Sequence, residues 1–122
     1  MPPEVLKLLL DIEQACGLIE QFTAEKTVDD LRQDAQLRSA VERQFITIGE
    51  SLQQALRLLP DLSSSIAESR RVINFRNVMV HGYAQIVPDT VWGVVEKDLP
   101  VLHAEVRHLI SSGSPSTASK DE

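Results

Sequence analysis

Two residues that could together cleave a phosphodiester stand five positions apart in the segment RNVMVHGY, residues 76–83. Histidine is the side chain best suited to proton transfer near neutral pH, so His81 can take up or release a proton during a reaction. Arg76 keeps its positive charge and offers a planar fork of donors that fits phosphate oxygens. Attack of a ribose 2′-hydroxyl on the adjacent phosphate needs a base, an acid and charge stabilisation at phosphorus. The pair therefore indicates RNA cleavage without a metal.

The same two residues also have structural uses, which the spacing alone leaves open. Arg76 could pair with Glu50 or another carboxylate, and His81 could be a C-terminal helix residue favoured by the helix dipole. On a regular helix, residues five apart point about 140° away from each other. Three routes could still bring them to one substrate: the helix distorts near Gly82, the arginine wraps round the helix, or two chains pool their residues.

No group of side chains in the sequence suggests a bound metal or a cofactor, and we predict neither. Cys16 is the single cysteine, which excludes an internal disulfide and a thiolate zinc site. Cys16 lies among apolar helical residues and is expected to be a small core residue. His103 and His108 are spaced by five rather than four, and we expect both to face solvent near the end of the last helix.

A periodicity of 3.6 residues predicts four helical segments. The first has one apolar stripe: Val5, Leu8, Leu9, Ile12, Cys16 and Ile19. The second is introduced by Thr27 and Asp30, which can form a capping box, and a short separate turn can precede its long stretch. Pro60 is expected to stop it, because proline cannot continue a helix.

The third segment, residues 65–81, carries the candidate residues. Ser65 is expected to cap its start, with Glu68 reaching back, and Gly82 is expected to end it in a left-handed conformation. One polar stripe and two apolar lines run along it. The stripe consists of Arg70, Asn74, Asn77 and His81, and the apolar lines are Ile66, Ile73, Val80 and Val72, Phe75, Met79. A second apolar face suggests a partner, most simply another copy of the chain.

The fourth segment begins after Pro88, with Asp89 as its expected cap. Pro100 lies within this segment and should kink it or split it into two pieces. Residues 111–122, SSGSPSTASKDE, are too polar and too rich in Ser, Gly and Pro to pack, so we expect a disordered tail. Residues 1–110 are then one domain. Short connections between its helices predict an all-α, antiparallel up-down four-helix bundle, with the last helix kinked or split near Pro100.

The charge of the chain limits its partners. The net charge of −6 argues against a broad nucleic-acid-binding surface, yet residues 61–83 carry a local net charge of +1. No apolar run approaches the ~20 residues that a membrane-spanning helix needs, so we predict no membrane partner. The start, MPPEVLKLLLDIEQA, lacks a basic region and carries carboxylates, so we expect no secretory signal and a cytoplasmic protein.

The segment RNVMVHGY fits the pattern Arg-Asn-x-x-x-His-x-Tyr, and with this pattern the chain resembles the small HEPN-domain proteins of prokaryotes, specifically the HepT-like toxins. The segment VERQFITIGESLQQAL, residues 41–56, looks like the second long helix of that family. The segment DTVWGVVEKDLPVL, residues 89–102, looks like its final helix, including the proline after Asp-Leu. The resemblance extends from the first helix to about Ile110.

The resemblance implies a homodimeric, metal-independent endoribonuclease that is the toxin of a toxin–antitoxin pair. By position it gives Arg76 and His81 the catalytic roles, with Asn77 as the polar residue after the arginine. It also implies a cognate minimal nucleotidyltransferase as antitoxin, which can silence the toxin by AMPylation of Tyr83. An alternative remains, because HEPN-like bundles can also be catalytically inactive nucleotide- or partner-binding modules, and the overall acidity favours that alternative.

Overall fold

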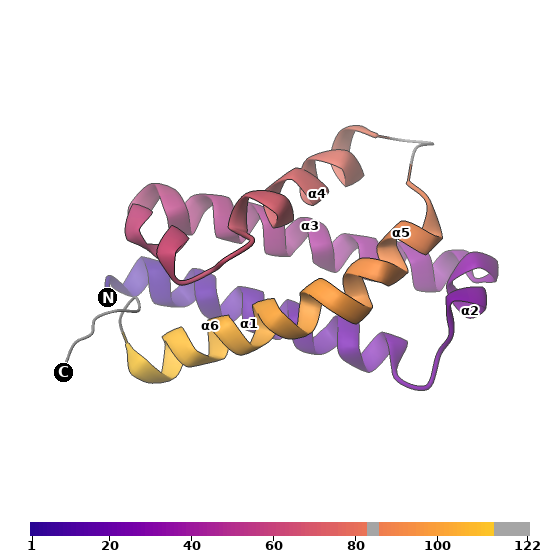
Figure 1. The fold of residues 1–122 in the computed structure, drawn as a ribbon, viewed down its shortest axis with the longest axis horizontal. Coiled ribbons are helices and arrows are strands. Elements are labelled where there is room, and N and C mark those ends of the chain that lie inside the picture. Colours follow the sequence, from indigo (N-terminus) through magenta and orange to yellow (C-terminus); the bar gives the residue numbers. More distant parts are fainter. Residues whose placement is uncertain (83–85, 114–122) are drawn as a thin grey trace.

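The protein is described by a computed structural model that places residues 1–82 and 86–113. These residues form a bundle of helices, as the sequence predicts (Figure 1). The elements in chain order are α1 (Pro3–Thr23), α2 (Val28–Gln33), α3 (Ala35–Leu58), the 3-10 helix η1 (Pro60–Ser64), α4 (Ser69–His81), α5 (Pro88–Gly93), the π-helix η3 (Val94–Asp98) and α6 (Leu99–Ser112). No strand occurs in the ranges placed, 1–82 and 86–113. Among these helices none is long and apolar enough to cross a membrane.

The core lies where α1, α3 and α6 run side by side (Figure 1). The predicted apolar stripe of α1 faces it: Val5, Leu9, Ile12, Cys16 and Ile19 are fully buried, whereas Leu8 is half-buried. Aliphatic side chains of α3 and α6 close the same core. Helical periodicity predicts this arrangement because residues three and four apart share one face of a helix.

The start of the second segment follows its capping signals. The hydroxyl of Thr27 accepts a bond from the Asp30 N–H at 3.2 Å, and the Asp30 carboxylate accepts one from the Thr27 N–H at 2.8 Å. This capping box begins the short helix α2, which is separate from α3. Asp34 then caps α3 by accepting a bond from the Leu37 N–H at 3.1 Å. The expected capping box and separate turn are confirmed.

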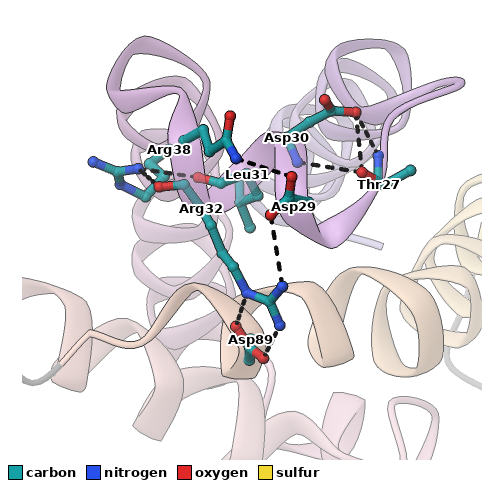
Figure 2. Close-up of polar contacts among 8 residues, drawn as sticks. Thr27, Asp29, Asp30, Leu31, Arg32, Arg38 and Asp89 are labelled. Carbon is teal, nitrogen blue, oxygen red and sulfur yellow. Dashed lines mark hydrogen bonds and ion pairs between the residues drawn. The ribbon is translucent and has the colours of Figure 1, made fainter.

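Side chains of α2 also tie it to its neighbours (Figure 2). Arg32 donates to both carboxylate oxygens of Asp89 in α5, at 2.9 and 2.6 Å. Arg38 of α3 donates to the carbonyl oxygens of Leu31 and Arg32 at the end of α2, at 3.1 and 2.5 Å. Asp89 is therefore a partner of Arg32, and the expectation that it caps the last helix is wrong. Val87 holds the N-cap position instead.

The expected start of the third helix at Ser65 is also wrong. Pro60 does end α3, at Leu58, but the chain then forms η1 and a turn before α4 begins at Ser69. Leu62 and Ile66 in this connection are completely buried, and Glu105 of α6 accepts a bond from the Ala67 N–H at 3.2 Å. Burial of two large apolar side chains outweighs the local capping signal, so the helix starts four residues later.

The last helix changes its winding before Pro100. The π-helical stretch η3 separates α5 from α6, and the Leu99 N–H bonds to the carbonyl of Val94, five residues back. Proline supplies no N–H for the regular ladder, and a π-turn is one way for a helix to absorb that loss. The break expected near Pro100 is thus an interruption of α-helical winding at residues 94–98, with helix on both sides.

Candidate active site

The candidate site is built on a close approach between α3 and α4. Gly49 of α3 is buried, and a Cβ placed there would overlap the Cβ of Arg76 and lie 2.6 Å from its Cγ. Only glycine leaves room for the stem of Arg76 to lie directly on the α3 backbone. The approach therefore fixes where the arginine side chain begins.

The guanidinium of Arg76 is held at both terminal nitrogens. Its Nη2 lies 3.0 Å from Glu50 Oε2 of α3, and its Nη1 donates to Asn77 Oδ1 at 2.9 Å. The side chain is 19% exposed, and its Nε is buried with no hydrogen-bond partner among the described residues. The pairing of Arg76 with Glu50, which the sequence left open as a structural use, is present.

His81 is the last residue of α4, and its side chain is exposed. The next residue, Gly82, has a φ of −82°, so the expected left-handed exit is wrong. The Gly82 N–H instead bonds to the Val78 carbonyl at 2.6 Å, and a Cβ on Gly82 would overlap that oxygen. Glycine is needed here for space. Because α4 stays regular to His81, helix distortion does not bring His81 toward Arg76.

Asn77 lies between Arg76 and His81 on the helix surface. Asn77 and His81 are four residues apart and therefore adjacent on one face, whereas Arg76 and His81 point about 140° apart. The bond from Arg76 to Asn77 turns the guanidinium toward the face that carries His81. Of the three routes considered from sequence, wrapping of the arginine is the one that the geometry favours within one chain. No hydrogen bond joins Arg76 to His81 among the residues described.

The polar stripe expected along α4 is present at its outer face. Arg70, Asn74 and His81 are exposed, and Asn77 is half-buried. Tyr83, the expected modification site, lies outside the described residues. The structure thus brings Arg76 and Asn77 together and leaves His81 accessible on the neighbouring turn.

A groove runs along α4 beside this stripe, between that helix and the last helix, and Asn74 of the stripe also lines it. Its volume is about 510 Å³. Its apolar lining includes Phe45, Val72, Phe75, Val78, Val94 and Leu102. Charged residues of both signs stand at its border, and Arg71 of α4 spans it to Asp98 of η3 at 3.5 Å. One of the two apolar faces predicted for α4 is therefore left open beside α5 and α6.

His103 does not face solvent as expected. It is 3% exposed, and its Nδ1 lies 2.9 Å from Oε2 of Glu20 on α1. Its position four residues after Leu99 and three before Val106 places it on the buried stripe of α6, which the sequence pattern could have indicated. His108 is exposed, as expected. The His103–Glu20 pair joins α6 to α1 and involves no residue of the candidate site.

Cys16 is buried in the core, as predicted, and its thiol is unreactive at neutral pH. Burial is the main cause that raises the pKa of its thiol to about 12, with Glu20 as a further cause. A thiol with so high a pKa is not a nucleophile at neutral pH. No group of three or more His, Cys, Asp or Glu in the described part of the chain could hold a metal.

Two residues of the site were not identified as functional candidates from the sequence. Gly49 gave a signal, because a glycine inside a strongly periodic helix often marks a close backbone approach. Glu50 appeared only as a possible partner of Arg76, and an exposed carboxylate on a long helix has no pattern that names its partner. Both lie on α3, on the segment quoted above as similar to a family helix.

Comparison with known proteins finds similarity over most of the chain. The family model described as "Ribonuclease HepT-like" matches residues 12–109. A protein of Thermococcus cleftensis named probable ribonuclease HepT is 30% identical over 101 residues, which cover 83% of this chain and 91% of that protein.

A second relative comes from Methanocaldococcus jannaschii. Its name pairs gamma-glutamylcyclotransferase with a proposed RNase activity, and it is 28% identical over 106 residues, 87% of this chain. The chain spans about half of that relative, 47% of its length. No solved structure gives a significant match. The family model covers most of the chain, including the candidate site, and the chain therefore belongs to the HepT-like ribonuclease family.

Proposed function

We propose that this protein is a metal-independent endoribonuclease whose reaction uses Arg76, Asn77 and His81. The observation that carries the proposal is the bond from Arg76 to Asn77, which directs a fixed cation toward the helix face of an exposed histidine. Membership of the HepT-like ribonuclease family supports RNA as the substrate. The local net charge of +1 over residues 61–83, in a chain of net charge −6, supports binding of RNA at the same face.

The proposed reaction is attack by a ribose 2′-oxygen on the adjacent phosphorus. The bond from the 2′-oxygen to phosphorus forms, the bond from phosphorus to the 5′-oxygen breaks, and a cyclic phosphate and a free 5′-hydroxyl result. A base takes the 2′-hydroxyl proton and an acid protonates the leaving 5′-oxygen. Arg76 stabilises the charge on the phosphoryl oxygens, and His81 carries out a proton transfer.

A two-fold homodimer would supply two histidines for the separate acid and base roles. The open apolar groove beside α4 supports self-association, because a second copy could bury its exposed apolar side chains. Both charge signs border the groove, so a two-fold interface can set the basic residue of one copy against acidic residues of the other. In this proposal the two copies of α4 lie at or beside the axis and form a shared RNA cleft.

The dimer is tested by substituting Val78, which lines the groove and is 48% exposed. We expect Val78→Glu to give a folded monomer in light scattering at micromolar concentration, because its carboxylate would be buried at the interface. Leu58→Glu is the matched control, since Leu58 is 53% exposed and does not line the groove. A parent protein that is monomeric at this concentration would contradict the dimer.

The resemblance to HepT-like toxins supports a toxin–antitoxin context. In this proposal a minimal nucleotidyltransferase neutralises the toxin by attaching AMP to Tyr83, and the added phosphate repels RNA and can engage Arg76. Intact-mass spectrometry after co-expression with such an enzyme tests this proposal. An unmodified toxin, or a mass increase that persists in Tyr83→Phe, would remove Tyr83 from this role.

A second function has one observation in its favour. Glu50 already neutralises Arg76 in the structure, as expected of a catalytically inactive module that binds a nucleotide or a partner. RNA cleavage separates the two functions. The purified protein is incubated with transfer RNA and messenger RNA, with and without chelator, beside His81→Ala and the control His108→Ala. We expect cleavage that survives the chelator and the control and is lost in His81→Ala. Equal cleavage by His81→Ala would contradict the catalytic assignment.

A further inference from the structure

The contact between Glu50 and Arg76 has a geometry that suits orientation of the arginine better than blocking of it. Each terminal nitrogen of a guanidinium carries two N–H groups. In the structure Nη2 bonds to Glu50 and Nη1 bonds to Asn77, so each of these bonds needs only one N–H. Among the described residues each terminal nitrogen has no other partner, so one N–H on each remains to meet phosphate oxygens.

The position of the Arg76 side chain explains why its guanidinium needs an anchor. The Arg76 Nε is buried without a hydrogen-bond partner, which is unfavourable for a polar group. Its Cβ and Cγ are confined against Gly49 of α3, but the guanidinium beyond them could still rotate away from this buried position. The bonds to Glu50 and Asn77 oppose that rotation. Asn77 belongs to the same helix as Arg76, so Glu50 is the contact that ties the guanidinium to the rest of the bundle.

We propose that Glu50 is a positioning residue that holds the Arg76 guanidinium toward the phosphate of bound RNA. This inference rests on the proposed ribonuclease function and adds a residue from a second helix to its site. Glu50 acts through Arg76 and does not touch the substrate. Its side chain is 47% exposed, so water screens its charge and limits its repulsion of the phosphate.

Two substitutions at Glu50 separate orientation from other roles. Glu50→Ala removes the acceptor, whereas Glu50→Gln keeps a side-chain oxygen that can accept from Arg76. We expect Glu50→Ala to lower kcat by about 10- to 100-fold, as misplacement of a catalytic group does, with KM changed less than about threefold. Glu50→Gln should retain kcat within about threefold of the parent, because its amide oxygen can still orient the guanidinium.

The matched control is Glu13→Ala. Glu13 of α1 also pairs with an arginine of another helix, Arg107 of α6, at 3.6 Å, and it is similarly half-exposed. This pair is on the α1–α6 side of the bundle, so its loss should leave kcat and KM unchanged. Circular dichroism and thermal melts of all the variants show whether any loss of activity reflects unfolding. A purely structural role of Glu50 would lower the melting temperature without the rescue of kcat by glutamine.

Each outcome decides the inference. Glu50→Ala that cleaves as fast as the parent overturns it, and faster cleavage would identify the ion pair as a block on Arg76. Equal loss of kcat in Glu50→Ala and Glu50→Gln also overturns it, because the carboxylate charge would then matter instead of the acceptor. If the parent protein does not cleave RNA, the proposed function fails together with this inference. A loss confined to Glu50→Ala, with His81 essential, supports both.

Discussion

Two of the arginine–carboxylate pairs that join helices in the described part of the chain, Arg32–Asp89 and Arg76–Glu50, differ in what holds the arginine. Arg32 of α2 meets Asp89 of α5 through two short bonds, at 2.9 and 2.6 Å, yet its side chain is 47% exposed. Arg76 meets Glu50 through one bond of 3.0 Å and is only 19% exposed. The number of bonds therefore does not indicate which arginine is more confined.

The difference lies in the backbone behind each pair. At Arg76 the α3 and α4 helices touch through Gly49, so the side chain lies on a neighbouring backbone before its charge meets any partner. At Arg32 the pair with Asp89 is made by two exposed side chains at the surface (Figure 2). An exposed ion pair contributes little to stability, because water and salt screen it. We therefore expect function to depend on the Arg76 pair, and we expect the Arg32 pair to make only a small contribution to stability, which is lost in acid.

Removing each arginine in turn should give the largest difference in the rate of RNA cleavage between the two pairs. We expect Arg76→Ala to lower the rate of RNA cleavage by about 10²- to 10³-fold, since it removes a charge-stabilising donor. Arg32→Ala should cleave at the parent rate. Both variants should keep their helicity, because neither side chain fills the aliphatic core. Initial rates with a single RNA substrate provide the measurement. Equal activity of the two variants would contradict the expectation that function depends on the Arg76 pair and not on the Arg32 pair.

A methyl group at Gly49 should have the next largest effect. Gly49→Ala forces the α3 and α4 backbones apart at Arg76, and overpacking of this kind costs about 1–3 kcal/mol. Gly17 of α1 is the matched control, because a Cβ there meets no atom within 4 Å. Gly17→Ala should stabilise the protein by about 0.5–1 kcal/mol through helix propensity.

Urea unfolding measures the stability of both glycine variants. RNA cleavage should fall in Gly49→Ala and stay at the parent level in Gly17→Ala, since only the first displaces Arg76. If Gly49→Ala is as stable and as active as Gly17→Ala, the close approach does not hold the arginine.

The smallest expected effect is the change in thermal stability of the Arg32 pair as the pH falls. The hydrogen bond from Arg32 is the main cause that lowers the pKa of Asp89 below its ordinary value of 3.8. A carboxyl group with a lowered pKa stabilises the folded state above its unfolded pKa, and this contribution is lost as the pH falls through the folded pKa. The melting temperature of the parent should therefore exceed that of Arg32→Ala slightly at neutral pH. The difference should vanish below pH 3.8 and shrink in high salt. A difference that is the same at every pH would show that Arg32 acts through packing.

Much of the fold could be predicted from local patterns. The buried stripe of α1, the capping box at Thr27 and the end of α3 at Pro60 each depend on residues within one or two helical turns. The candidate residues Arg76, Asn77 and His81 could also be named from sequence, because they form one short motif. Their catalytic role and that of Tyr83 remain predictions.

Three of the errors fall where packing against another segment competes with a local signal. Ser65 carries a capping pattern, but burial of Leu62 and Ile66 places it in a turn. Asp89 could cap a helix, but Arg32, 57 positions earlier, takes its carboxylate. His103 looked like a surface histidine, but it is buried and pairs with Glu20 of α1. In each case the decisive contact comes from a part of the chain that local reading does not include.

Periodicity and capping act between residues a few positions apart, so the helices, their apolar faces and the motif of α4 could be predicted from local patterns. Packing between helices sets the rest: Gly49 receives the stem of Arg76, Glu50 and Asn77 hold its guanidinium, and the groove beside α4 stays open. An amphipathic pattern specifies which face of a helix is covered. It does not specify which residue of another helix covers it, or how closely the two backbones approach.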